Sequence, residues 1–435
     1  MHLLRKTSAL AALALTLLIT PVSLGKSSAY TETVLHSPVS PTGPVLKDGN
    51  VLYGTTQSGG THGAGVVFSY DLSTSTYVEL FSFSVVTNQP AGSLIIDTSG
   101  NLYGVLQNGG GLYSGGEIFE LQKPAIAGNP WVYHVVYDFC TGSSCTDGKT
   151  PGAGLTYAGA SSGTEYDGTS LLFGTTSSGG ANNHGAVYAL QLSGGTWSEK
   201  VIRSFKGSPT DGDTPSGGAL WMDSSNNLWG TTNFGGSAGK GIAFKLHPRG
   251  DLWTDTWSYG RLYNFCWTNV TKCPDGNLPN GVIMDASGNL LGSTTLGGNG
   301  QQSTGNGVIF KLNNGSCTEG GTTTFWCNTV LYNFCPSSGC ADGSEPGGLL
   351  AMDSSGNLFG STTYGGSGGS SPFGGTAFKL NTSHTESVLY NFCSAGSCSD
   401  GEYPIGGVIL DASGNLYGTT FRGGANMGVL YKLTP

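Results

Sequence analysis

The chain has 435 residues, of which 74 are glycine and only 10% are charged, with a formal net charge of −9. Few Lys and Arg argue against nucleic acid or an anionic membrane as a partner, because both are bound through clustered basic side chains. A 37% hydrophobic and 10% aromatic content supports a folded core, and glycine beside aromatic residues favours short strands joined by tight turns.

Residues 1–29 have the features of a signal peptide. Arg5 and Lys6 precede an apolar run over 9–19 that is too short to span a bilayer, and small residues allow cleavage after Gly25 or Ala29. No second apolar stretch follows. We therefore expect residues 30–435 to form a single monomeric domain without a membrane span, secreted or periplasmic.

One phrase recurs seven times along this domain. An aromatic residue or Leu precedes a glycine, Thr-Thr or Ser-Thr usually follows it, and a Gly-Gly pair stands five and six positions later. The central glycines are Gly54, Gly104, Gly174, Gly230, Gly292, Gly360 and Gly418. Each repeat divides into four short strand-like segments bounded by turn residues, including Asp-x-Ser-Gly-Asn hairpins such as residues 353–357.

Four antiparallel strands per repeat predict an all-β, seven-bladed β-propeller of four-stranded blades. The last repeat ends after its third strand, at residues 431–433, while residues 32–36 resemble a fourth strand with no repeat before it. We expect this N-terminal strand to pair with the C-terminal blade and close the ring, which hides sheet edges. A solenoid, the alternative, would need capping repeats, and none is visible.

The ten cysteines form five close sequence pairs, four of which fall at the same place in a repeat. The pairs are Cys140 with Cys145, Cys266 with Cys273, Cys317 with Cys327, Cys335 with Cys340, and Cys393 with Cys398. Local disulfides of an oxidising compartment are the economical interpretation. Zinc binding is the alternative, but such sites need further ligands that converge on the cysteines. We expect no metal and no cofactor.

The Asn-Leu-Tyr-Gly-Thr-Thr phrase of residues 415–420, followed by Gly-Gly, resembles the GloVer tandem-repeat family of exported bacterial proteins. The resemblance extends over nearly all of the predicted mature chain. It implies an extracytoplasmic location and no established reaction. Members of the family are similar in ending with surface-sorting anchors, whereas this chain ends at residues 433–435 without one, so we expect release into the periplasm or medium.

In an ordinary propeller the Gly-rich loops between strands two and three share one rim with the loops that link the blades. The variable side chains of these loops mix aromatic rings with polar groups, a combination that suits sugar rings and hydroxyls. The predicted binding residues are Tyr113, His184, Phe234, Tyr364, Phe421 and Arg422. The alternative is that these side chains only pack against one another around the channel mouth.

Acidic residues repeated in every blade are expected to be structural, since a single active site needs each residue once. The hairpin series Asp97, Asp223, Asp285, Asp353 and Asp411 fits turn capping, and the Asp-Gly series Asp147, Asp211, Asp275, Asp342 and Asp400 fits Asx turns, with calcium as an alternative. Glu345 and Glu402 lie in the loops from which a glycosidase would take its two carboxylates.

Our leading hypothesis is an exported, non-enzymatic binding or scaffold propeller for polysaccharide. The alternatives are a propeller hydrolase or lactonase with a funnel site, and a structural surface protein that contacts other proteins. A carboxylate pair or metal in the channel mouth would favour the enzyme, and a shallow aromatic rim would favour binding.

Overall fold

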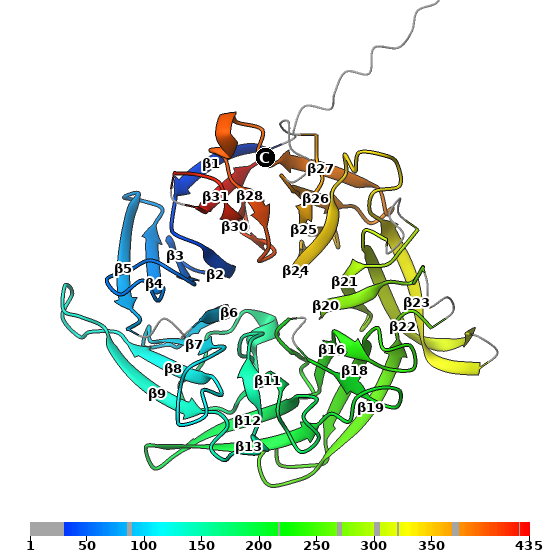
Figure 1. Ribbon diagram of the computed structural model, residues 1–435, viewed down its shortest axis with the longest axis horizontal. Coiled ribbons are helices and arrows are strands. Elements are labelled where there is room, and N and C mark those ends of the chain that lie inside the picture. Colours follow the sequence, from blue (N-terminus) through cyan, green and yellow to red (C-terminus); the bar gives the residue numbers. More distant parts are fainter. Residues whose placement is uncertain are drawn as a thin grey trace, which may run out of the picture.

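The computed structural model describes residues 30–84, 89–215, 218–267, 272–299, 305–319, 322–367, 374–425 and 427–435. The predicted signal peptide, residues 1–29, lies outside the described residues. Seven antiparallel sheets stand around a common centre, and the strand that begins each repeat lies innermost (Figure 1). The all-β, seven-bladed propeller predicted from the repeats is confirmed.

Four blades follow the simple order of four consecutive strands. Blade 1 contains β2 (Pro41–Asp48), β3 (Val51–Thr56), β4 (Val66–Asp71) and β5 (Thr76–Ser82). Blade 2 contains β6 (Pro90–Ile96), β7 (Leu102–Leu106), β8 (Glu117–Gln122) and β9 (Val132–Asp138). Blade 5 contains β20 (Asn277–Met284), β21 (Leu290–Leu296), β22 (Val308–Glu319) and β23 (Thr322–Asn333). Blade 6 contains β24 (Ser344–Met352), β25 (Leu358–Tyr364), β26 (Thr376–Leu380) and β27 (Glu386–Asn391).

The other three blades have shortened or divided innermost strands. Blade 3 contains β10 (Lys149–Pro151), β11 (Leu172–Ser178), β12 (Ala186–Ser193) and β13 (Thr196–Ser204), with the short 3-10 helix η1 (Ala160–Ser162) inserted after β10. Blade 4 contains β15 (Trp221–Met222), β16 (Leu228–Thr232), β18 (Ile242–Pro248) and β19 (Trp257–Asn264), and β14 (Gly212–Asp213) pairs with β17 (Phe234–Gly235) beside it. Blade 7 contains β28 (Glu402–Pro404), β29 (Ile409–Leu410), β30 (Leu416–Arg422) and β31 (Val429–Thr434), preceded by the 3-10 helix η2 (Gly396–Cys398).

The N-terminal strand closes the ring. Strand β1 (Thr31–His36) pairs antiparallel with β31, with Thr31 opposite Thr434 and Val34 opposite Tyr431. Blade 7 thus takes its outer strand from the start of the described chain and its inner strands from the end, as predicted. The closed ring leaves no blade without neighbours on both sides (Figure 1).

The recurring glycine of the second strand makes room for an aromatic ring of the third. A Cβ atom on Gly230 would lie 2.7 Å from the Cζ atom of Phe244, which is itself fully buried. The same third-strand position is filled in every blade by a fully buried ring, namely Phe68, Phe119, Tyr188, Phe244, Phe310, Phe378 and Tyr431. Close packing of this ring explains why the phrase contains glycine in all seven repeats.

Glycines also bring the innermost strands of neighbouring blades together at the centre. Gly92 has a φ of +65°, and a Cβ atom there would lie 2.5 Å from the amide nitrogen of Gly154 in blade 3. A Cβ atom on Gly348 would likewise lie 2.5 Å from the amide nitrogen of Gly407 in blade 7. Only glycine permits this close backbone approach between neighbouring blades.

All five predicted disulfides form between the expected partners, and the described cysteines include no free thiol. Four of the bridges close short loops between blades: Cys140 with Cys145, Cys266 with Cys273, Cys335 with Cys340, and Cys393 with Cys398. The fifth joins Cys317 on β22 to Cys327 on β23, whose long hairpin projects from blade 5 (Figure 1). With every sulfur in a disulfide, the alternative of zinc bound by cysteine thiolates is wrong.

Candidate functional site

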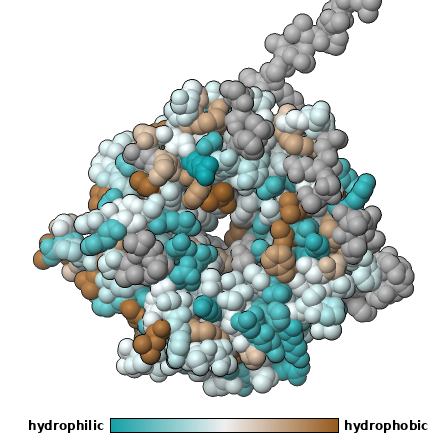
Figure 2. All heavy atoms as spheres, in the orientation of Figure 1, coloured by the Kyte–Doolittle hydropathy of each residue, from teal (hydrophilic) through white to brown (hydrophobic). Residues whose placement is uncertain are grey.

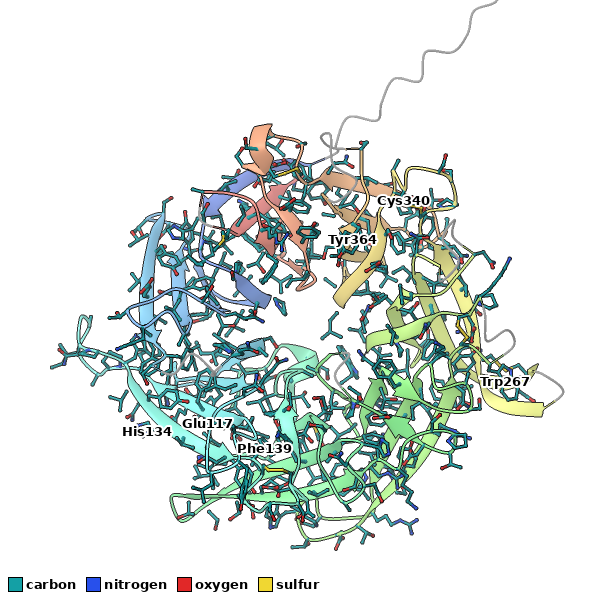
Figure 3. All side chains as sticks on the ribbon, in the orientation of Figure 1. Glu117, His134, Phe139, Trp267, Cys340 and Tyr364 are labelled. Carbon is teal, nitrogen blue, oxygen red and sulfur yellow. A yellow bond between two sulfur atoms is a disulfide. The ribbon has the colours of Figure 1, made fainter. Side chains whose placement is uncertain are left out.

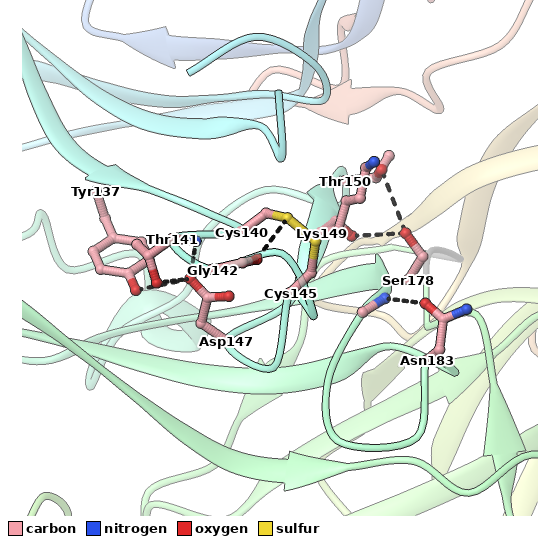
Figure 4. The surroundings of a disulfide bond; sticks show 11 residues. Tyr137, Cys140, Thr141, Gly142, Cys145, Asp147, Lys149, Thr150, Ser178 and Asn183 are labelled. Atoms are coloured by element: carbon pink, nitrogen blue, oxygen red, sulfur yellow. Dashed lines mark hydrogen bonds between the residues drawn. A yellow bond between two sulfur atoms is a disulfide. The ribbon is translucent and has the colours of Figure 1, made fainter. Parts of the chain in front are cut away.

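The Gly-rich loops and the disulfide loops lie on the same face of the ring, as predicted. The second glycine of a Gly-Gly pair donates its N–H to the carbonyl of the cysteine that ends the neighbouring disulfide loop. These bonds run from Gly180 to Cys145 (2.9 Å), from Gly298 to Cys273 (2.7 Å), from Gly366 to Cys340 (2.8 Å) and from Gly424 to Cys398 (2.9 Å). We call this face the glycine-loop rim. Figure 4 shows one disulfide loop on it, with the Cys140–Cys145 bridge beside Asp147.

At the start of six blades, one residue other than glycine has a left-handed backbone conformation. It immediately precedes the proline of the innermost strand and donates its N–H to a carbonyl in the preceding blade. Tyr403, for example, bonds to Gly374 at 3.2 Å and Glu345 to Asn306 at 2.8 Å. These pre-proline residues are Ser40 (φ 48°), Thr150 (φ 59°), Thr214 (φ 56°), Leu278 (φ 58°), Glu345 (φ 57°) and Tyr403 (φ 58°). At each junction the interblade hydrogen bond therefore fixes the direction in which one side chain leaves the rim.

The end of the second strand places another side chain on the rim. The second Thr of the recurring phrase donates its hydroxyl to the carbonyl two residues later. The bonds run from Thr362 to Tyr364 (3.0 Å), from Thr420 to Arg422 (2.8 Å) and from Thr232 to Phe234 (2.6 Å). The Thr side chain thus holds the rim residue in place, which gives the Thr-Thr part of the phrase a positioning role.

Between blades 6 and 7 these two kinds of rim residue enclose an aromatic pocket of about 260 Å³. Its walls are Thr363, Tyr364, Tyr403, Ile405, Phe421 and Arg422. The rings of Tyr364 and Tyr403 meet edge to face with centroids 5.4 Å apart, and the Arg422 guanidinium lies 5.3 Å from the centre of the Tyr403 ring. Figure 3 shows Tyr364 near the inner end of blade 6, towards the middle of the ring.

A carboxyl group lies beside this pocket. Glu345 is close enough to Tyr364 for its charge to contribute to a raised pKa of the phenol, after the larger effect of burial, while Arg422 opposes the rise. Burial also raises the pKa of Glu345 above its usual value. The pocket therefore combines two phenols, a guanidinium and a phenyl ring, and a half-buried carboxyl group stands beside it.

The pocket adjoins the central channel through Ile405, which lines both. The channel holds a cavity of about 220 Å³, and its described lining is made of Gly, Ala, Ser, Pro, Leu, Ile and Asn residues from all seven blades. None of these described residues carries a charge. Figure 2 shows the opening in the middle of the ring.

The structure brings together three of the six predicted binding residues, Tyr364, Phe421 and Arg422. The other three lie elsewhere on the rim. The Nδ1 atom of His184 lies 3.0 Å from a carboxylate oxygen of Asp213, whose register partner in blade 4 is Phe234. Phe234 is 47% exposed, and Tyr113 is 44% exposed in the Gly-rich loop of blade 2.

Tyr403 completes the pocket but does not stand out in the sequence, because it follows Asp-Gly-Glu in a loop that would be read only as a turn. The signal that could have found it is its position before Pro404. The same position in the preceding repeat is Glu345, whose carboxyl group lies beside the pocket.

The two repeated Asp series are structural. In the hairpins, Asp353 Oδ1 accepts from the N–H groups of Ser355 and Asn357, at 2.9 Å each, as turn capping requires. In the Asp-Gly series the carboxylate bonds backwards along the chain: Asp342 Oδ2 accepts from the Tyr332 hydroxyl at 2.8 Å and from the Cys335 N–H at 2.9 Å. The predicted Asx turn is therefore replaced by a cap on the disulfide loop.

Among the described residues one group of potential metal ligands comes within 4.8 Å, namely Cys393, Cys398 and Glu402. Its two sulfur atoms are joined in a disulfide, so neither offers the thiolate that a metal would need. Within the described part of the chain, no helix has the length and apolar character needed to cross a membrane.

The closed ring, its uncharged channel and its disulfide-capped rim define the chain as a disulfide-stabilised β-propeller. The sequence profile of the Gloeobacter/Verrucomicrobia repeat matches residues 26–171 and 166–431. These matches include most of the sequence, and the chain therefore belongs to the Gloeobacter/Verrucomicrobia repeat family. The predicted family resemblance is confirmed.

No curated protein matches the sequence. Solved propeller structures are similar at low identity. A puromycin-hydrolyzing peptidase of Mycobacterium tuberculosis is 11% identical with a TM-score of 0.45, and the match covers 90% of this chain and 51% of the peptidase. The polysaccharide lyase Uly1 is 11% identical with a TM-score of 0.44, and the match covers 94% of this chain and 92% of the lyase. This chain thus spans about half the length of the peptidase, and no activity is carried over from either protein.

Proposed function

We propose that the chain is an extracytoplasmic carbohydrate-binding propeller and that its binding site is the aromatic pocket between blades 6 and 7. The observation that carries the proposal is the composition of this pocket. Tyr364, Tyr403 and Phe421 offer rings on which the apolar faces of a sugar can pack, and Arg422 and the tyrosine hydroxyls offer hydrogen bonds to its oxygen atoms.

The rigidity of the pocket also supports binding. Tyr364 and Tyr403 are held by their own backbone hydrogen bonds, from Thr362 and to Gly374, before any ligand arrives. Arg422 is held over the Tyr403 ring. A ligand would therefore spend little free energy on ordering these side chains.

An extracytoplasmic location is part of the proposal. The five disulfides fit an oxidising compartment, and the two Gly-rich loops at the pocket are each tied to a disulfide loop, at Cys340 and Cys398. The features of residues 1–29 fit export, although they lie outside the described residues.

The test is retention of the purified protein on immobilised xylan, carboxymethyl cellulose, polygalacturonate and solubilised peptidoglycan. We expect retention on at least one polymer and release by the same polymer in solution. Failure to bind any of them, or any sugar on a broad glycan array, would contradict the proposal.

A hydrolase is the second candidate, and one observation favours it. Glu345 lies beside the pocket with a raised pKa, which is a property of general acids. Release of reducing sugar from the retained polymer, abolished by Glu345→Gln, would favour the hydrolase. Retention without release, unchanged by that substitution, would favour binding alone.

A further inference from the structure

Two positions on the glycine-loop rim can be compared between blades: the residue at the end of the second strand or two residues beyond it, which we call the strand-end residue, and the pre-proline residue. Their equivalence follows from the strand register. In blades 3 to 7 the strand-end residue is paired with the residue just before the pre-proline one, as in Phe234 with Asp213, Leu296 with Asn277, Tyr364 with Ser344 and Arg422 with Glu402. The side chains of different blades can therefore be compared position by position.

Contacts at blades 6 and 7 show how these positions join. Within blade 6, Tyr364 is paired with Ser344, the neighbour of the pre-proline residue Glu345. Across the junction, Tyr364 meets the pre-proline residue Tyr403 of blade 7, and within blade 7 Tyr403 lies beneath Arg422. The two kinds of position thus alternate along the rim, first within a blade and then across the next junction.

The residues at these positions divide the rim into two halves. From blade 1 to the pre-proline residue of blade 4 they are small or polar: Ser40, Ser58, Gln89, Asn108, Thr150, Ser178 and Thr214. From the end of the second strand of blade 4 onwards they are mainly aromatic or aliphatic, with one residue of each charge. This second set, which we call the rim arc, consists of Phe234, Leu278, Leu296, Glu345, Tyr364, Tyr403 and Arg422.

The rim arc is longer than the pocket that it contains. Phe234 stands at its far end, two blades from the pocket, and leaves 47% of its surface exposed. A single sugar in the pocket would not reach this ring. Exposed apolar surface bordered by polar groups is typical of a contact site, and a ligand that continued from blade 7 to blade 4 would cover it.

Taking the glycan site of the proposed function as given, we propose that the rim arc binds a linear polysaccharide along its length. One part of the polysaccharide occupies the pocket of Tyr364, Tyr403 and Arg422, and sugar units further along it pack on Leu296, Leu278 and Phe234. The ligand is therefore a polymer that contacts several blades, and not a free monosaccharide.

The test uses fragments of two and six sugar units prepared from whichever polymer in the retention test binds most tightly. Dissociation constants are measured by calorimetry for the wild-type protein and three variants. For the wild type we expect the six-unit fragment to bind about tenfold more tightly than the two-unit fragment. Phe234→Ala should remove most of this gain and leave binding of the two-unit fragment unchanged.

Tyr403→Asn and Leu112→Ala are the matched comparisons. Asn tolerates the left-handed conformation of position 403, so this variant removes the ring with little change in backbone strain, and it should weaken both fragments. Leu112 is also an exposed apolar residue, 93% exposed, but it lies in the Gly-rich loop of blade 2, outside the rim arc, so its removal should affect neither fragment. Melting temperatures confirm that each variant is folded.

Equal affinity of the wild type for both fragments, or an unchanged six-unit affinity in Phe234→Ala, would overturn the polymer model while leaving the pocket in place. If, in that case, Tyr403→Asn is the only variant that loses binding of the two-unit fragment, the site is a single-sugar site. No binding of any polymer by the wild type would overturn the proposed function itself, and the rim arc with it.

Discussion

Two core tyrosines occupy a position that the other five blades fill with phenylalanine. Tyr188 and Tyr431 are fully buried, and neither hydroxyl oxygen has a hydrogen-bond partner among the described residues. Their equivalents are Phe68, Phe119, Phe244, Phe310 and Phe378. A buried hydroxyl without a partner loses its hydrogen bonds to water on folding and gains none within the protein, so it destabilises the fold.

Tyr188→Phe and Tyr431→Phe should therefore each stabilise the fold, by about 1 kcal/mol. The measurement is the free energy of unfolding in a denaturant titration. Phe244→Tyr is the reverse control: it would place a hydroxyl against Gly230 and should destabilise the protein. A loss of stability in Tyr188→Phe would show that the hydroxyl is satisfied in solution and would contradict this account.

At the same scale, sequence reasoning found some of the candidate site and missed the rest. Tyr364, Phe421 and Arg422 could be selected because they vary where the rest of the phrase repeats. Their closeness to one another could not be predicted, since it depends on which loops of adjacent blades touch. Tyr403 was missed because a residue before proline is ordinarily extended, whereas here an interblade hydrogen bond holds it in the left-handed region.

Strands of neighbouring blades bring acidic groups together at the blade junctions. Glu199 on β13 of blade 3 is partly buried near Asp147, which belongs to the loop that follows blade 2. Burial, and then the charge of Asp147, raise the pKa of Glu199 to about 8. At the junction of blades 6 and 7, burial and Asp400 raise the pKa of Glu32 on β1 to about 7.

A raised pKa means that folding favours the protonated carboxyl group. The stability that protonated Glu199 contributes is therefore complete below the unfolded-state pKa of 4.5, and it is lost as the pH rises through about 8. Glu199→Gln, which stays neutral, should therefore raise the melting temperature by about 5 °C at pH 8.5 and have little effect at pH 4.5. Thermal unfolding at both pH values gives the comparison. A shift of equal size at both would indicate that the Glu199 carboxyl is not protonated by folding.

The repeat phrase was sufficient to predict the strands of each blade, but not their exact pairing. All seven blades share a register shift between the third and fourth strands just before the buried ring, for example between Val67 and Phe68 or Ala377 and Phe378. A period of two in the sequence cannot reveal such a bulge, because the extra residue interrupts the alternation of the strand. The extended hairpin of β22 and β23 was also unpredicted, since it lies outside the repeat.

The ring as a whole depends on one short strand. Removal of residues 30–37 would expose the edge of β31 and uncover part of the core of blade 7, in which Tyr431 and Leu433 are fully buried. We expect the melting temperature to fall by about 10 °C or more. Val34→Ala, which keeps the strand pairing and changes a side chain that is 39% exposed, is the control. An unchanged melting temperature after the deletion would contradict closure by β1.

The seven-bladed ring could be predicted in full because its evidence, a count of repeats and an incomplete repeat at each end, is contained in the sequence. Function was less accessible, because a binding site on a propeller is built from single residues of different blades.

The direct test of the central claim is a calorimetric titration of wild-type protein and Tyr403→Asn with the polymer that retains the wild type. The account predicts that the substitution weakens binding at least about tenfold while the melting temperature stays within a few degrees of the wild-type value. Equal affinities would place the site elsewhere and contradict the account.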